Sequence, residues 1–336
     1  MKALIETIIT VKVTFQAFLF ANYRPQLERI FAELQSVLER RSLDTQYEVQ
    51  NTIRHLQSSS DWLIKVYLGI ETFSLTVYCV IPTGLTILKY ATTGIVPPLI
   101  GIAEADFVLF DFTSSFWIWL PITLFTDLII VLNIIMTVIQ DSFYWCLLHH
   151  VSCLFKIIKM QIIRLDEFHE AQQFHEKLIE IVLMQGVAYR SLLQKCQRIK
   201  TALSALMLLL YGTCMCILCM TMMVIAIASG DTDLLSKMGV IVYFIFFQIF
   251  SYSMLGTELM TASSSIADAV YATHWYKRSI PEQRNLLFVL KRSQRMATLT
   301  AANLFGVSRA TFTMTIRSAF SYFTVLWQFY GTSEHP

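Results

Sequence analysis

Long apolar runs alternate with polar stretches along this chain, and their lengths predict membrane-spanning helices. A helix needs about 20 mostly apolar residues to cross the roughly 30 Å hydrocarbon core of a bilayer. Five runs meet this requirement: 62–88, 116–140, 203–229, 238–258 and 307–331. The last run contains two arginines, Arg309 and Arg317, toward its start and is apolar after them. Residues 3–20 form a weaker candidate, because Glu6 and Lys12 interrupt the run. The pattern therefore predicts about six spans, one of them weak.

The polar connections between these runs carry most of the positive charge. The connections 21–61, 141–202 and 274–300 hold 19 of the chain's 26 Lys and Arg residues, whereas the alternate connections hold very few. The positive-inside rule then places these three connections in the cytoplasm and the C-terminus outside the cell. Apolar residues recur at spacings of three and four within the connections 21–61 and 141–202, as amphipathic helices require. We expect the inner connections to be helical and to pack together.

Composition supports a membrane protein and excludes several other classes. Of 336 residues, 55% are hydrophobic and 15% are charged, against roughly 45–50% and 25% in soluble domains. The mean hydropathy of +0.55 is too high for a surface that faces only water. The net charge of +2 gives no reason to expect a nucleic-acid partner. The predicted fold class is all-α, a polytopic transmembrane helical bundle forming a single domain within the lipid bilayer.

The sequence contains no pattern that indicates catalysis, a cofactor or a metal. Cys214, Cys216 and Cys219 lie inside an apolar run without a nearby histidine to complete a zinc site, so packed thiols are expected. A glycine-rich phosphate loop and a Gly-x-Ser-x-Gly motif are both absent. We therefore expect neither an enzyme nor a bound cofactor or metal ion.

Polar side chains inside the apolar runs are a stronger signal, because such residues are costly in lipid and usually face a partner or a cavity. Glu71, Asp127 and Asn133 are of this kind. Hydrogen bonds between helices would explain them, and a polar group in a ligand cavity is the alternative. The outer halves of the spans also carry aromatic residues that suit a pocket for a small apolar molecule. The candidate pocket residues are Phe73, Thr76, Tyr78, Trp119, Phe125, Tyr243 and Phe247.

The last apolar run carries a stripe of polar residues spaced by four, four, three and four positions. The stripe consists of Thr313, Arg317, Ser321, Thr324 and Gln328. This spacing places them on one face of a helix, and such a face avoids lipid. Val325 borders the stripe and would form an apolar ring beside the Gln328 ring in a symmetric assembly, which is one way to build a gate. Contact between helices is the alternative.

The C-terminal part of the chain resembles the insect odorant receptor family. The segment from Asp141 to His149 is also similar to the inner end of that family's fourth span. The resemblance is densest in Gly256, Ser263, the pair Tyr271-x-x-x-Trp275, Phe305-Gly-Val-Ser308, Thr311-Phe312 and Ser321-Tyr-Phe-Thr-Val-Leu326. A near relative, the gustatory receptor family, is also similar at Tyr322 and Gln328-Phe329, so a gustatory receptor channel is the alternative.

The resemblance implies a ligand-gated, non-selective cation channel with seven spans, an inward N-terminus and an outward C-terminus. It implies a tetramer with a shared co-receptor subunit in the dendrite membrane of sensory neurons, and a small apolar volatile ligand held in the outer half. It further implies that Val325 is the hydrophobic gate, with Gln328, Thr324, Ser321 and Arg317 along the pore. Residues 1–20 resemble the inner part of the second span, so the first span is expected to be absent from this chain.

Two other classes of membrane protein remain as alternatives. A G-protein-coupled receptor would place the C-terminus inside the cell, and neither Asp-Arg-Tyr nor Asn-Pro-x-x-Tyr occurs. A secondary transporter would show broken spans in two related halves. Pro82 and Pro121 interrupt two of the runs, but no half-repeat accompanies them.

Overall fold

The computed structural model describes residues 2–42, 47–93, 116–168, 170–193, 197–227, 232–302 and 304–334, and helices dominate these residues. This confirms the all-α fold class. Most of the connection between the runs 62–88 and 116–140 lies outside the described residues. The elements in chain order are α1 (Lys2–Ser42), α2 (Tyr47–Leu75), the π-helix η1 (Thr76–Val80), α3 (Ile81–Thr93), α4 (Phe116–Ile163), the 3-10 helix η3 (Arg164–Glu167), α5 (Ala171–Leu193), α6 (Gln197–Ile227), α7 (Thr232–Ala272), the 3-10 helix η4 (Trp275–Lys277), α8 (Ile280–Ser293), β1 (Thr300–Ala301), β2 (Phe305–Gly306) and α9 (Arg309–Glu334).

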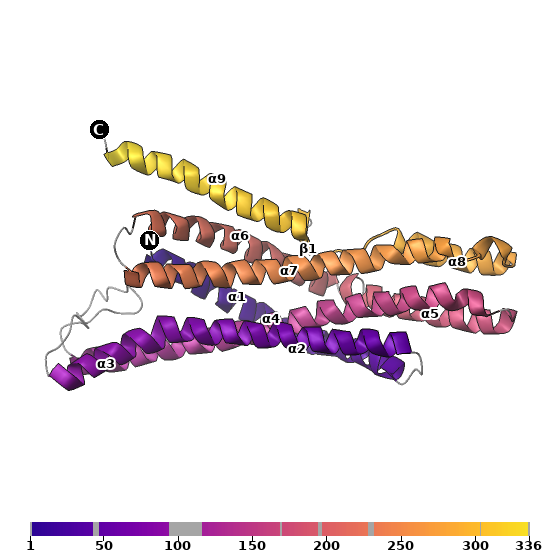
Figure 1. Ribbon diagram of the computed structural model, residues 1–336, viewed down its shortest axis with the longest axis horizontal. Helices are drawn as coiled ribbons and strands as arrows, with labels where there is room; N and C mark the ends of the chain where they lie inside the picture. Colours follow the sequence, from indigo (N-terminus) through magenta and orange to yellow (C-terminus); the bar gives the residue numbers. More distant parts are fainter. Residues whose placement is uncertain are drawn as a thin grey trace.

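The long helices run roughly along one axis of an elongated bundle, and the two ends of the chain lie toward the same end of it (Figure 1). Helix α4 is central and packs most extensively on α7, with α1, α2 and α5 also against it. Helix α9 packs on α6 and α7 and diverges from the bundle toward its own C-terminal end (Figure 1).

Five helical segments within the described residues are long and apolar enough to cross a membrane: Leu4–Arg41, Tyr47–Thr92, Phe116–Glu167, Leu203–Ile227 and Leu234–Ala272. The weak candidate 3–20 therefore belongs to a long apolar helix, the first half of α1. Helix α9 has the length to span but is less apolar, because the polar stripe lowers its hydropathy. Its membrane crossing stays a prediction.

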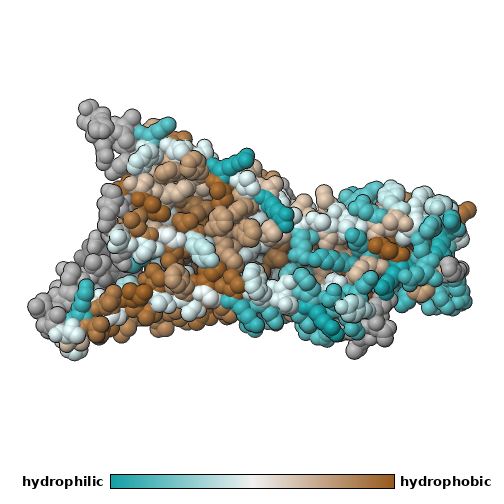
Figure 2. All heavy atoms as spheres, viewed as in Figure 1, coloured by the Kyte–Doolittle hydropathy of each residue, from teal (hydrophilic) through white to brown (hydrophobic). Residues whose placement is uncertain are grey.

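The surface divides into an apolar part around α3 and a polar part around α5 and α8 (Figure 2). We call the first the outer half, following the predicted orientation, and the second the inner half. The outer half comprises residues 4–20, 62–93, 116–140, 203–227, 232–254 and 309–334. The inner half comprises residues 21–61, 141–193 and 255–300.

A π-helical turn joins α2 to α3, so that residues 47–93 form one continuous helical segment. The N–H of Ile81 donates to the carbonyl of Thr76, five residues back. Pro82 follows immediately and has no N–H to give, so the local ladder must be rearranged near it. Such single wide turns often occur at functional sites. Here the turn contains Tyr78, which lines the cavity described below.

A short antiparallel hairpin links the inner half to α9. Strand β1 pairs with β2 in the register Thr300 to Gly306 and Ala301 to Phe305. The hairpin is followed by a close approach between Gly256 of α7 and Val307. A Cβ atom at residue 256 would lie 2.3 Å from the Val307 carbonyl oxygen. Glycine is therefore required for α7 to pack against the start of α9.

Candidate functional site

A cavity of about 250 Å³ lies in the outer half and is lined by α1, α2, η1, α4, α6 and α7. The surface of its wall is mostly apolar, with Phe244 and Tyr78 as its aromatic residues. Isoleucine is the most frequent residue on the wall, at positions 9, 129, 130, 134, 217, 241 and 245. A space of this size and character suits a molecule of a few carbon atoms rather than a nucleotide or a peptide.

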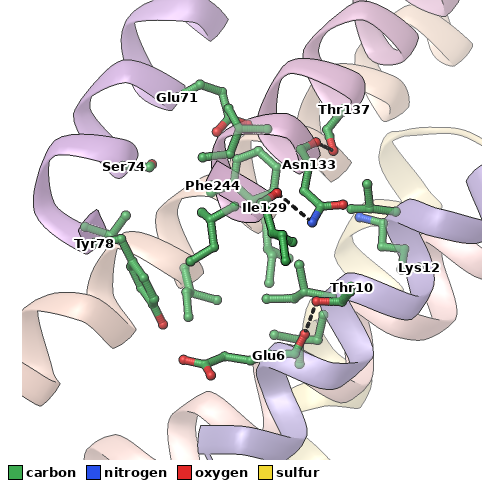
Figure 3. Close-up of a pocket in the computed structure, with 18 of the residues that line it drawn as sticks. Glu6, Thr10, Lys12, Glu71, Ser74, Tyr78, Ile129, Asn133, Thr137 and Phe244 are labelled. Carbon is green, nitrogen blue, oxygen red and sulfur yellow. Dashed lines mark hydrogen bonds between the residues drawn. The ribbon is translucent and has the colours of Figure 1, made fainter. Parts of the chain in front are cut away.

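Charged and polar side chains lie at the two ends of this cavity. Figure 3 shows Glu71 above it and Lys12 beside it, on the side that leads to the inner half. Glu6 and Tyr78 lie at the opposite end (Figure 3). Glu71 is 5% exposed and Lys12 is 4% exposed, so both groups are removed from solvent. Each end of an apolar cavity thus offers a group that can orient a ligand.

A buried hydrogen-bond network continues from Lys12 toward the inner half. The Lys12 ammonium donates to Gln248 Oε1 at 2.8 Å, and the Gln248 amide donates to Asp141 Oδ2 at 2.5 Å. The hydroxyls of Tyr67 and Tyr252 donate to the two oxygens of Asp141, each at 2.7 Å. Buried charges persist only when they are paired and hydrogen-bonded. This network satisfies Asp141 and ties α1, α2, α4 and α7 together beneath the cavity.

The three polar residues singled out inside the apolar runs fall into two groups. Glu71 and Asn133 both line the cavity. Asp127 instead accepts a hydrogen bond from Thr83 at 3.0 Å, which links α4 to α3. The structure therefore places two of these residues where a ligand could meet them and uses the third between helices.

Of the seven candidate pocket residues, Tyr78 lines the cavity. Phe73, Phe125 and Tyr243 are exposed on the outer surface of the bundle. Thr76 is half-buried and donates its hydroxyl proton to the Thr72 carbonyl. These positions follow from helix rotation, which the alternation of apolar residues does not specify when a helix is apolar on all sides.

The remaining two candidates pack into the protein at other places. Trp119 is buried against Phe116 in a small cluster near α3. Phe247 stacks on Tyr67 with ring centroids 6.0 Å apart and also contacts Trp145 edge-on. Phe247 therefore lies against the Asp141 network, through Tyr67, and is absent from the cavity wall.

Sequence reasoning did not propose Glu6, Lys12, Asp141, Gln248 or Tyr252 as functional residues. Glu6 and Lys12 were noted only as interruptions of an apolar run. The signal that could have found them is the one applied to Glu71, namely that an ionisable group inside such a run faces a partner or a cavity. Asp141 lies at the boundary between a predicted span and its inner connection, where an acidic residue is unremarkable.

The polar stripe of α9 is largely uncovered by the rest of the chain. Thr313, Arg317, Ser321 and Gln328 are exposed and Thr324 is half-buried, while Val325 is 46% exposed. Among the described side chains of α9, Ala319 is the last buried one. The outer part of this helix therefore presents both its polar stripe and Val325 to whatever surrounds this chain.

Within the described residues, no group of three or more His, Cys, Asp or Glu residues could hold a metal ion. Cys214 and Cys219 are buried, whereas Cys216 is exposed, so the three thiols do not converge on one point.

Comparisons with known proteins agree with this architecture. A family model described as 7tm Odorant receptor matches residues 1–320. Odorant receptor 22c of Drosophila melanogaster is 25% identical over 202 residues, which are 56% of this chain and 48% of that protein. The odorant receptor coreceptor of Aedes aegypti is 32% identical over 94 residues, 28% of this chain and 20% of that protein. The chain thus spans about half or less of the curated relatives it matches.

The fold is also similar to that of a solved structure. The insect olfactory receptor OR5 from Machilis hrabei, in complex with eugenol, superposes with a TM-score of 0.80 over 97% of this chain and 82% of that one, at 17% identity. The same receptor without a named ligand gives a TM-score of 0.75. At this identity the likeness concerns the fold alone.

Proposed function

The chain belongs to the insect odorant receptor family, and from this premise we propose that it is a subunit of an odorant-gated cation channel. A small volatile molecule binds in the cavity between α1, α2, α4, α6 and α7 and favours an open pore. The observation that carries the proposal is the apolar cavity itself, which lies inside the membrane-type half of the bundle and has its charged groups at its ends.

The ligand in this proposal is small and mainly apolar. The cavity of about 250 Å³ and its isoleucine-rich wall support that choice, because apolar surface removed from water supplies most of the binding free energy. Currents recorded over an odorant panel, from cells that express this chain with a co-receptor, test it. Responses to acids alone would contradict it.

The partner in this proposal is an odorant co-receptor, within a four-subunit assembly. Similarity to the co-receptors of three mosquitoes and two ants supports a common mode of assembly. The uncovered outer part of α9 supports a pore-lining role, since a polar stripe beside Val325 needs surroundings other than lipid. In this arrangement Val325 forms the narrowest apolar ring, with Gln328 beyond it and Thr324, Ser321 and Arg317 along the path.

Paired mutants test the pore proposal. Val325→Ala widens and wets the apolar ring, so current without ligand is expected to rise. Leu326→Ala is the matched control, because Leu326 is similarly exposed, at 42%, but lies off the stripe. Gln328→Glu is expected to change the relative permeability to cations, since it adds a charge beside the ion path. Unchanged leak and selectivity in the Val325 and Gln328 mutants, at normal surface levels, would show that α9 does not line the pore.

The predicted orientation separates this proposal from a G-protein-coupled receptor. A tag placed at the C-terminus is expected to be accessible from outside intact cells. If the tag is labelled only in permeabilised cells, the C-terminus lies inside the cell. That result would contradict the predicted orientation and the channel proposal.

A further inference from the structure

The cavity offers hydrogen-bond acceptors more readily than donors. Four hydroxyl groups on its wall, from Thr10, Ser74, Thr126 and Thr137, each donate to the carbonyl four residues earlier in their own helix. Because a hydroxyl has a single proton, these groups keep only lone pairs for a ligand. Asn133 likewise uses one N–H on the Ile129 carbonyl, at 3.0 Å. A ligand that donates a hydrogen bond therefore finds more partners here than one that only accepts.

Glu71 provides an acceptor that lacks a hydrogen-bond donor within the described part of the chain. Its Oε1 atom is buried and receives no hydrogen bond from the part of the chain that the structure describes, although Glu71 lines the cavity. The neighbouring Tyr67 hydroxyl gives its proton to Asp141 at 2.7 Å. Lys12, at the same end of the cavity, donates to Gln248. A buried carboxyl oxygen without a donor is costly, and a ligand in the cavity can supply a donor to this carboxyl group.

We propose that this cavity selects small, mainly aliphatic molecules that carry one hydrogen-bond-donating group, an alcohol hydroxyl or an amine N–H, which donates to the Glu71 carboxyl group. The inference rests on the proposed function and adds the chemical class of the ligand. The aliphatic wall covers the carbon skeleton, while Glu71 receives the donor at the inner end. Carboxylate ions are disfavoured, because an apolar wall does not replace their hydration.

The test is a series of compounds with one carbon skeleton and different functional groups. The series contains the alcohol, the primary amine, the methyl ether, the ketone and the parent hydrocarbon. Currents are recorded from cells that express this chain with the co-receptor. The half-maximal concentration of the alcohol or the amine is expected to be about ten-fold or more below that of the ether and the hydrocarbon, because an acceptor left without a donor in an apolar cavity weakens binding.

A variant then assigns the preference to Glu71. In Glu71→Gln the side-chain amide both donates and accepts. The ratio of the ether's half-maximal concentration to the alcohol's is therefore expected to fall to about three-fold or less. Asp127→Asn makes the same acid-to-amide change in the outer half but away from the cavity wall, and is expected to keep the ratio. The ratio is taken within one variant, so it does not depend on surface level. The unmutated series tests the ligand class even if Glu71→Gln fails to reach the surface.

Each outcome decides between the two proposals. Equal potency of alcohol and ether, or a preference for the ketone that would indicate Lys12 as a donor, overturns the inference and leaves the proposed function standing. An unchanged ratio in Glu71→Gln overturns the role of Glu71. If no compound acts on receptor present at the cell surface, while the co-receptor responds to its own agonist, the proposed function fails and this inference fails with it.

Discussion

The two halves of α4 have similar residue types and opposite surroundings. In the outer half, large apolar side chains such as Leu124, Leu128 and Leu132 are about half exposed. In the inner half, beyond Gln140, Leu154 and Phe155 are fully buried, as are most of their neighbours. One continuous helix thus leaves an environment in which apolar surface is uncovered and enters one in which it is packed against protein.

The difference indicates two sources of stability within one bundle. In the inner half, water drives apolar side chains together, as in a soluble protein. In the outer half, lipid is as apolar as the side chains, so packing, hydrogen bonds and polar contacts between helices must hold the structure. The Asp141 network lies where the two halves meet and supplies such contacts from four helices. Four changes should separate the two sources.

The largest effect is expected from Asp141→Ala. This change leaves the buried donors of Tyr67, Tyr252 and Gln248 without their acceptor, and the loss of a partner from a buried charged network costs about 3–5 kcal/mol. Thermal unfolding of the detergent-solubilised protein is the measurement. Asp127→Ala is the matched control on the same helix, since Asp127 is only half-buried and its recorded partner is Thr83. Equal losses in the two variants would contradict a special role for the boundary network.

The next effect compares arginine at two similarly exposed leucines. Leu132 of α4 is 53% exposed in the outer half, and Leu183 of α5 is 61% exposed in the inner half. If only the outer half contacts lipid, Leu132→Arg should cost about 2.5–3.5 kcal/mol of insertion free energy, whereas Leu183→Arg should stay within about 0.5 kcal/mol. The fraction of each variant that inserts and reaches the surface is the measurement. Similar losses at both sites would remove the distinction between the halves.

A smaller effect is expected at the contact between α7 and the start of α9. Gly256→Ala would place a Cβ atom 2.3 Å from the Val307 carbonyl oxygen, and such overpacking costs about 1–3 kcal/mol. Gly186→Ala in α5 is the control, because a Cβ atom there meets nothing within 4 Å and alanine favours a helix by about 0.5–1 kcal/mol over glycine. We expect the first to lower the unfolding temperature and the second to raise it slightly. A tolerated Gly256→Ala would mean that α9 can shift without loss.

The smallest effect concerns a helix end in the inner half, where water competes for backbone groups. Glu282 accepts hydrogen bonds from the N–H and the hydroxyl of Ser279, at 3.0 and 2.8 Å, and so closes the N-terminus of α8. Glu282→Ala is expected to lose about 1 kcal/mol, as is typical of a lost cap. Arg284→Ala is the control for an ordinary surface change, because Arg284 lies two residues later and is exposed. Thermal unfolding would show the difference, and indistinguishable variants would mean that the cap contributes nothing measurable.

Much of the fold could be predicted from the sequence, because the signals for each helix lie within its own segment. The run 116–140 lies in α4, which continues without a break into the inner half, and the amphipathic pattern of the connection 141–202 appears in α5. Helix α7 likewise extends the run 238–258 in both directions. Length, hydropathy and charge are properties of a segment alone, and these properties were sufficient for the helical class and for the division into apolar and polar halves.

The candidate site required the tertiary structure, because a site depends on how helices are rotated against one another. A helix that is apolar on every side has no sequence signal for the face that meets its neighbour, so Phe125 looked as suitable for a pocket as Tyr78. Charged residues were better guides, since lipid excludes them: Glu71 was identified from the chain and does line the cavity. In the folded chain, Glu71 of α2 and Lys12 of α1 lie at the same end of the cavity, next to the Asp141 network, although these residues are far apart in sequence. Packing alone decided it.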